Sequence, residues 1–233
     1  MIESARLPTT IDTLLERNRA WSSRMQASDS EFFSRLAHQQ TPQLLWIGCS
    51  DSRVAANQIL DLAPGEVFTH RNIANIVASG DMNCLSVLQF ATDILQVRHI
   101  AVVGHYGCSG IRAAVGGIRL GLVDNWLGHI HAVHKKHAGL LLKMPDTRKP
   151  DAMCELNVAE QFSHVCQTHI VRDAWARGQQ ISVHGWVYGI EDGLLRKMGL
   201  TASSTDEAED AYCSAIESIA DRHRIQGPQP VAG

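Results

Sequence analysis

Apolar residues along this chain follow two patterns, short β-branched runs and longer stretches with helical spacing. Four of the runs predict buried strands, at about 44–50, 66–70, 99–104 and 180–187, and a short further strand is predicted near 194–200. Helical spacing predicts helices at 9–24, 28–38, 54–62, 83–97, from 108 onward, and at 123–142, 152–177 and 205–224. Strands that alternate with helices favour an α/β fold. We expect a mostly parallel central sheet, with four parallel strands plus a short edge strand, flanked by helices.

The length of 233 residues is enough to bury a substantial core. We expect a single domain over residues 1–233. In this domain 1–40 would form an amphipathic N-terminal helical arm and 226–233 a loose tail. No internal repeat or low-complexity segment interrupts the chain.

Charge and hydropathy narrow the possible partners. The net charge of −3 and the absence of a Lys/Arg run argue against nucleic acid. No apolar stretch reaches the roughly 18 residues that a membrane span needs, and the first residues do not resemble a secretory signal. We therefore expect a cytoplasmic protein without a membrane partner, whose six cysteines are buried thiols or metal ligands rather than disulfides.

Metal-ligand side chains end two of the predicted strands. Cys49 and Asp51 follow the strand at 44–50, and His105 and Cys108 follow the strand at 99–104. If these strands are neighbours, with the strand at 66–70 outside the first, the four side chains converge where strand order reverses. Two thiolates, an imidazole and a carboxylate form a complete tetrahedral set for zinc. The alternative is that the cysteines are ordinary buried thiols. This alternative would explain either cysteine alone, but it explains less well why four ligand-type residues end two strands.

Arg53 gives this site a possible means of opening. A zinc with four protein ligands is normally structural, whereas catalysis needs an open position. The guanidinium of Arg53 could take the carboxylate of Asp51 in a bidentate contact and so free a position for water. The alternative is a plain local ion pair. Because two thiolates cancel the charge of zinc, activity should rise toward alkaline pH.

These residues resemble the β-class carbonic anhydrases, and the likeness extends over about 10–224. It rests on the segments 49–53 (CSDSR), 104–108 (GHYGC), 66–72 (EVFTHRN), 83–87 (NCLSV) and 184–189 (HGWVYG). The resemblance implies one zinc per chain, held by Cys49, His105 and Cys108, with Asp51 as the exchangeable fourth ligand. It further implies reversible hydration of carbon dioxide to bicarbonate and a proton, with Asp51 and Arg53 as catalytic residues.

The resemblance also assigns roles away from the metal. Gln40 matches a glutamine of the substrate pocket, although by itself it would be a solvated polar residue. Trp46, Arg71 and Tyr188 match a subtype that bicarbonate inhibits at a separate site, together with a glycine directly before the first cysteine. The two aromatic residues could instead be core packing. Ser109 departs from the family, which usually has glycine there.

Other clusters have simpler explanations. His129, His131, His134 and His137 share one predicted helix, and a solvated or interface face is favoured over a second metal site because no sulfur or carboxylate joins them. The remaining cysteines fall inside predicted helices and are expected to be buried thiols, namely Cys84, Cys154, Cys166 and Cys213.

Three functions remain open on the sequence alone. The first is a carbonate dehydratase. The second is a non-catalytic zinc protein that acts as a bicarbonate sensor or scaffold. The third is a relative that hydrolyses another small linear molecule such as carbon disulfide. The resemblance implies a homodimer or homotetramer.

Overall fold

The computed structural model describes residues 10–224, which divide into two compact units between Gln40 and Thr41. The N-terminal unit consists of helices α1 (Ile11–Ser28) and α2 (Phe32–His38), as the sequence predicts. The Trp21 ring of α1 makes edge-on contacts with Phe32 and Phe33 of α2, with centroids 6.5 and 5.7 Å away. The expected loose tail at 226–233 lies outside the described residues.

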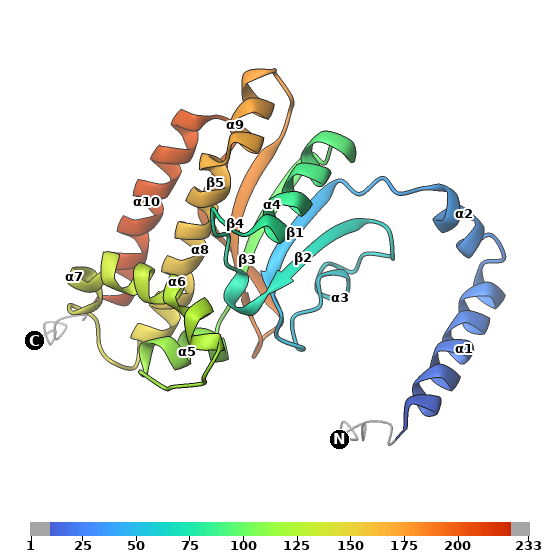
Figure 1. Ribbon diagram of the computed structural model, residues 1–233, viewed down its shortest axis with the longest axis horizontal. Helices are drawn as coiled ribbons and strands as arrows, with labels where there is room; N and C mark the ends of the chain where they lie inside the picture. The colour runs from blue at the N-terminus through green and yellow to red at the C-terminus, as the bar shows by residue number, and fades with distance from the viewer. Residues whose placement is uncertain (1–9, 225–233) are drawn as a thin grey trace, which may run out of the picture. The chain divides into compact units, whose positions relative to one another are not determined.

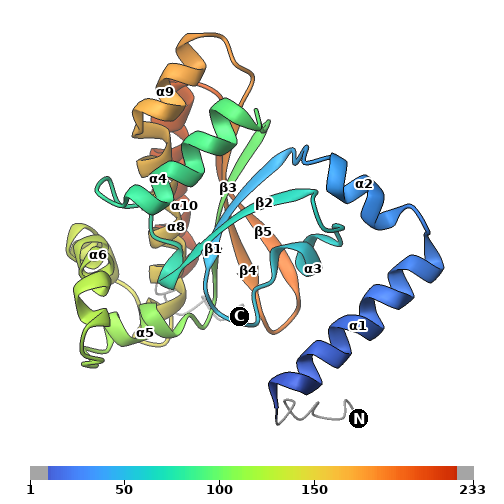
Figure 2. The ribbon, with the colours of Figure 1, turned by 45° about the vertical axis from the view of Figure 1, so that its right-hand side comes forward.

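The second unit is built on one five-stranded sheet (Figures 1 and 2). Its strands are β1 (Leu44–Cys49), β2 (Val67–Asn72), β3 (His99–His105), β4 (Ser182–Gly189) and β5 (Leu194–Ala202). The order across the sheet is β2-β1-β3-β4-β5, with the first four strands parallel and β5 antiparallel to β4. The predicted fold class is confirmed, and so is the placement of β1 between β2 and β3.

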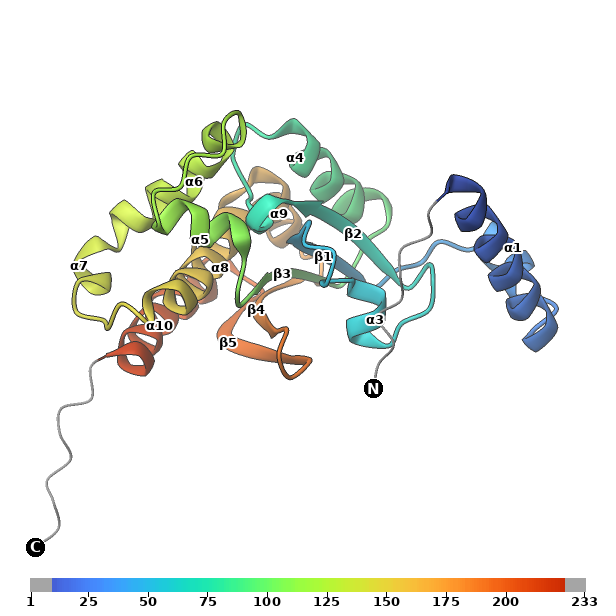
Figure 3. The same cartoon turned by 90° about the horizontal axis from the view of Figure 1, so that it is seen from below.

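Helices connect these strands and cover one face of the sheet most fully (Figure 3). They are α3 (Ala56–Leu60), α4 (Met82–Gln89), α5 (Ser109–Val115), α6 (Val123–Lys136), α7 (Ala138–Leu141), α8 (Lys149–Gln167), α9 (His169–Ala176) and α10 (Thr205–His223). Helix α8 packs on β3, β4 and β5, and α10 packs on α8 and β5. A smaller apolar cluster around Trp46 and Val103 is separate from this main core. Among residues 10–224, no helix has the length and apolar character to cross a membrane.

The prediction of one continuous helix at 152–177 is wrong, because the helix is interrupted at Thr168. The backbone there is extended, with φ −62° and ψ 143°. The Thr168 hydroxyl accepts the N–H of Val171 at 3.3 Å and donates to the carbonyl of Val165 at 2.8 Å. It therefore ends α8 and caps α9, which helical spacing alone does not reveal.

Two other predicted helices also end early. The helix at 123–142 is interrupted at His137, and the one at 83–97 passes into a π-turn over Phe90–Ile94, followed by left-handed Gln96 with φ 52°. In this π-turn the side chain of Ile94 is 66% exposed.

Three of the four cysteines expected to be buried thiols are buried, namely Cys84, Cys154 and Cys166. The expectation for Cys213 is wrong, since it lies on an exposed position of α10. The helical pattern of the sequence correctly predicts a helix at this position. One face of α10 packs on α8 and the other faces solvent, and Cys213 lies on the solvent face.

Two glycines on adjacent strands let α8 approach the sheet closely. A β-carbon on Gly104 of β3 would lie 2.5 Å from Cγ2 of Val158, and one on Gly185 of β4 would lie 3.1 Å from its Cγ1. Val158 is completely buried. The side chain of Val158 therefore occupies the space that side chains at 104 and 185 would need, directly beside His105.

We predict that Gly104→Ala lowers the free energy of unfolding by about 1–3 kcal/mol, since the added methyl group overpacks Val158. Urea denaturation measures the change. Gly128→Ala is the matched control, because Gly128 lies inside α6 with open space around it and alanine there should raise stability by about 0.5–1 kcal/mol. A Gly104→Ala protein as stable as the wild type would contradict the close approach of α8.

Candidate metal centre

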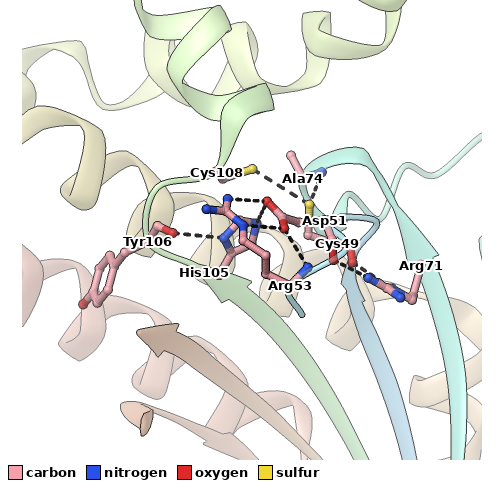
Figure 4. A network of polar contacts seen from close by, with 8 residues as sticks. All are labelled: Cys49, Asp51, Arg53, Arg71, Ala74, His105, Tyr106 and Cys108. Carbon is pink, nitrogen blue, oxygen red and sulfur yellow. Dashed lines mark hydrogen bonds and ion pairs between the residues drawn. The ribbon is translucent and has the colours of Figure 1, made fainter. Parts of the chain in front are cut away.

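Parallel pairing brings the ends of β1 and β3 to one edge of the sheet. Gly48 is in register with Val103, so Cys49 and His105 end neighbouring strands at the same side. A tight turn then returns the chain, with Gly107 at φ +69°, a conformation that favours glycine. Cys108 follows the turn and caps the N-terminus of α5, beside the other two side chains (Figure 4).

The three side chains have the geometry of a metal-binding group. Their ligand atoms all lie within 4.8 Å of one another, and all three residues are buried. The Cys49 and Cys108 sulfur atoms are 3.9 Å apart. Two sulfurs at about 2.3 Å from a tetrahedral zinc would be about 3.8 Å apart. The site therefore fits zinc without rearrangement of the thiols.

The imidazole of His105 is oriented for metal binding. Its Nδ1 lies 3.0 Å from the carbonyl oxygen of Tyr106, which can only accept a hydrogen bond, so Nδ1 carries the proton. The lone pair is then on Nε2, which is buried and has no hydrogen-bond partner within residues 10–224. A buried acceptor without a partner is costly, and a metal ion would satisfy it.

The two thiols are electrostatically unequal. Their mutual hydrogen bond lowers the pKa of Cys49 and, together with burial, raises the pKa of Cys108. The backbone N–H of Ala74 also donates to the Cys49 sulfur, at 3.4 Å. Cys49 is therefore the sulfur that loses its proton more readily, and a thiolate is a suitable ligand for a soft cation.

Asp51 lies at the rim of this group and is held by Arg53. The guanidinium donates through Nε to Oδ1 at 2.9 Å and through Nη2 to Oδ2 at 2.7 Å, and the Arg53 backbone N–H donates to Oδ1 at 3.0 Å. These bonds hold the pKa of the Asp51 carboxyl far below its usual range. Oδ2 is also 3.9 Å from the free Nε2 of His105. The carboxylate thus lies between the arginine and the candidate ligands.

The residues expected to bind a regulatory anion lie on three strands, Arg71 on β2, Trp46 on the adjacent β1 and Tyr188 on β4, which β3 separates from β1. The guanidinium of Arg71 donates to the carbonyls of Cys49 and Asp51, at 2.9 and 2.5 Å. The Trp46 indole lies over Gly48, where a β-carbon would meet Nε1 at 2.2 Å, and this buried N–H has no partner within residues 10–224. Tyr188 packs against the same apolar cluster as Trp46.

A cavity of about 580 Å³ opens beside the ligands. Asp51, Arg53 and Ser109 contribute polar groups to its lining, and Ile73 and Leu127 are among its apolar residues. Gln40 is the last residue of the N-terminal unit, and its place in a substrate pocket stays a prediction.

The histidine-rich helix has a partner that the sequence did not reveal. Nε2 of His137 lies 2.7 Å from the Glu160 carboxylate of α8, so His137 is a buried residue that donates a hydrogen bond to Glu160, while His129 and His131 are exposed. A second group of possible ligands, His70, Asp81 and Cys84, also lies close together. The Asn72 amide donates to Nε2 of His70 at 3.2 Å, which occupies that lone pair.

Sequence reasoning missed two residues behind the site. Asn157 and Gln161 are fully buried on α8, and they bond to the backbone of the segment that contains Ala74. A signal was available, since the two amides are four residues apart and share one helix face with the apolar residues Cys154 and Val165.

Comparison with known proteins agrees with the site. Residues 44–195 match the family model described as carbonic anhydrase. A carbonic anhydrase of Emericella nidulans is 42% identical over 195 residues, which cover 83% of this chain and 86% of that protein.

Solved structures give the same result. The β-carbonic anhydrase of Coccomyxa, solved in complex with acetazolamide, has a TM-score of 0.82 at 37% identity and covers 91% of this chain and 99% of its own. One of two tetrameric β-carbonic anhydrases of Sordaria macrospora has a TM-score of 0.79 at 36% identity. The match covers 84% of this chain and 100% of that chain. The chain that carries this buried Cys-His-Cys group therefore belongs to the β-class carbonic anhydrases, the carbonate dehydratases among the lyases.

Proposed function

We propose that this protein hydrates carbon dioxide reversibly to bicarbonate and a proton with one zinc per chain, held by Cys49, His105 and Cys108. The observation that carries the proposal is the buried, unpartnered Nε2 of His105 beside two sulfurs 3.9 Å apart. Zinc at such a site supplies a Lewis acid that lowers the pKa of water and so provides a nucleophile near neutral pH. A stopped-flow hydration assay combined with metal analysis tests the proposal.

Asp51 is proposed to exchange between the metal and Arg53. When Asp51 is on the metal the site is closed, and when it is on Arg53 a coordination position is free. The bidentate contact and the 3.9 Å separation from His105 Nε2 support this exchange, because a small side-chain movement connects the two positions. A permanently closed structural zinc would have no need of an arginine that takes one ligand. This favours the enzyme over the non-catalytic sensor.

The apolar side of the cavity suits an uncharged substrate. Leu120, Val123 and Leu127 give it an apolar side, and Asp51 and Arg53 lie in the same lining. Carbon dioxide is apolar overall, whereas bicarbonate is charged, so the apolar side would favour substrate and the polar side would favour product. A role of Gln40 in substrate binding remains a prediction from the resemblance.

Bicarbonate inhibition is proposed to act through Trp46, Arg71 and Tyr188. Arg71 bonds the backbone carbonyl of Asp51, so an anion that competes for this guanidinium would release the backbone that carries the exchanging carboxylate. The unpartnered Trp46 N–H is a second donor available to such an anion. The anion shifts the equilibrium only if it prefers the closed form, in which Asp51 is on the metal.

A homodimer or homotetramer is proposed, and the tetrameric relatives from Sordaria macrospora support it. A cytoplasmic location remains a prediction from the sequence.

Removal of either sulfur ligand should remove the metal. The wild-type protein should purify with about one zinc per chain, and Cys49→Ala or Cys108→Ala with almost none, because thiolates neutralise the ion. Elemental analysis of the purified proteins measures this. Cys213→Ala is the control, since this cysteine is exposed on α10 and its variant should keep zinc. Full zinc retention in both ligand variants would exclude the proposed ligand set.

Arg53→Ala should keep zinc but reduce carbon dioxide hydration by roughly 100-fold or more, because Asp51 loses its acceptor and stays on the metal. Stopped-flow assays at matched zinc content give the rate. Arg177→Ala is the control, since it removes another arginine that pairs with a carboxylate, Asp93, away from the site. Near-normal hydration by Arg53→Ala would contradict the exchange of Asp51.

Tyr188→Phe should weaken bicarbonate inhibition at neutral pH by about tenfold, which corresponds to the loss of one hydrogen bond to a charged group. The measurement is the inhibition constant of bicarbonate in the hydration assay. Tyr212→Phe removes a hydroxyl that binds Glu160 instead, and it should leave inhibition unchanged. Equal inhibition of wild type and Tyr188→Phe would show that the anion does not use this hydroxyl.

A further inference from the structure

The backbone segment Ile73–Val77 lies beside the metal centre and is held by side chains from several elements. Its residues 74–77 are buried. The side chains that hold it, with the backbone groups they bond, are Asn72 (N–H and C=O of Ile76), Trp126 (C=O of Ile73), Asn157 (C=O of Ala74) and Gln161 (N–H of Val77). The bond distances lie between 2.7 and 2.9 Å. The segment is therefore fixed along its length.

The segment needs this support because its backbone is in an unfavourable conformation. Ala74 has φ 64° and ψ 29°, and Asn75 has φ 47°. Consecutive left-handed residues that carry a β-carbon are rare, since the β-carbon approaches the backbone too closely. Such backbone conformations persist only where the surroundings determine them, and they cluster at functional sites.

This conformation aims one backbone group at the metal centre. The N–H of Ala74 points to the sulfur of Cys49, 3.4 Å away, as Figure 4 shows. The φ and ψ angles of Ala74 relate its N–H to its carbonyl, so a right-handed Ala74 could not direct the N–H to Cys49 and the carbonyl to Asn157 at the same time. The unfavourable backbone and the hydrogen bond to the ligand are therefore one feature.

Asn157 is the residue that best accounts for how Ala74 is held. Its side chain is completely buried on α8, and Nδ2 donates to the Ala74 carbonyl at 2.9 Å. Its Oδ1 accepts Nε2 of Gln161 at 3.0 Å. Because Oδ1 is occupied by a donor, the amide cannot flip, and its NH₂ group must face Ala74.

We propose that Asn157 is a positioning residue for the metal centre: it holds Ala74 in the left-handed conformation and so directs the Ala74 N–H to the Cys49 sulfur. The proposal rests on Cys49 being a metal ligand, as proposed above. A hydrogen bond to a ligating thiolate orients the sulfur and withdraws part of its charge, so it adjusts both the affinity for the metal and the donation of electrons to it.

The test is Asn157→Leu, which keeps the approximate volume and removes the donor. Zinc affinity is measured by competition with a chelator, and cobalt(II) replaces zinc for spectroscopy. We expect zinc to bind about 10- to 100-fold more weakly. We also expect the thiolate-to-cobalt charge-transfer band to move to lower energy, because the sulfur lone pairs lose a stabilising donor. A purely structural role for Asn157 would not move this band.

A second substitution tests the conformational part of the proposal. Glycine adopts the left-handed conformation without a β-carbon, so Ala74→Gly should reduce the dependence on Asn157. In the double variant Ala74→Gly, Asn157→Leu, the band and the zinc affinity should move back toward the wild-type values.

Controls separate this proposal from stability and from the metal site itself. Tyr212→Phe removes a hydrogen bond to another α8 residue, Glu160, and should leave the band and the zinc affinity unchanged. If Asn157→Leu does not fold, Gln161→Leu keeps Asn157 but releases its amide, and a smaller shift in the same direction is expected.

An unchanged cobalt band and zinc affinity in the folded variant would overturn the proposal, as would the absence of any rescue by Ala74→Gly. If the wild-type protein itself bound no zinc or cobalt through Cys49, the proposed metal site would fail, and this proposal with it. Metal binding by wild type with unaffected variants would refute the positioning role alone.

Discussion

The parallel pairing of β1 with β3 is the contact on which the metal centre depends. The ligands are short side chains, so they can meet only if the ends of the two strands stop at the same level. Side chains alternate between the two faces of a strand, so a shift of one residue would turn Cys49 away from His105. The backbone ladder from Leu44 to Gly48 therefore sets the distance between ligands that are far apart in the chain.

The site also lies at a boundary between the core and solvent. Cys49, His105 and Cys108 are buried, whereas the side chain of Arg53 is 53% exposed. The Asp51 carboxylate is between them at 13% exposure. In the proposed exchange, the charge of this carboxylate would be compensated in either position, by the metal ion or by the guanidinium.

The sequence predicted most of this arrangement because the informative residues end strands. Ligand-type residues after two apolar runs predicted the convergence at the sheet edge, and the structure brings Cys49, His105 and Cys108 together. What the sequence could not predict comes from contacts across the fold. The break at Thr168 depends on a side-chain cap, the role of His137 on a carboxylate of another helix, and the left-handed Ala74 on amides more than 80 residues away.

Most of helix α8 is buried, yet four of its buried residues carry polar side chains. Glu155 bonds Tyr106 and Arg222, and Glu160 bonds His137 and Lys136, while the two amides bond the segment beside the site. A wholly apolar helix in this position could slide or rotate by a turn and bury nearly the same area. With these polar groups, every displaced arrangement would leave charges and amides without partners. The interior of α8 therefore encodes a unique register, and substitution of its polar residues by leucine or methionine would trade a single native arrangement for several of comparable energy.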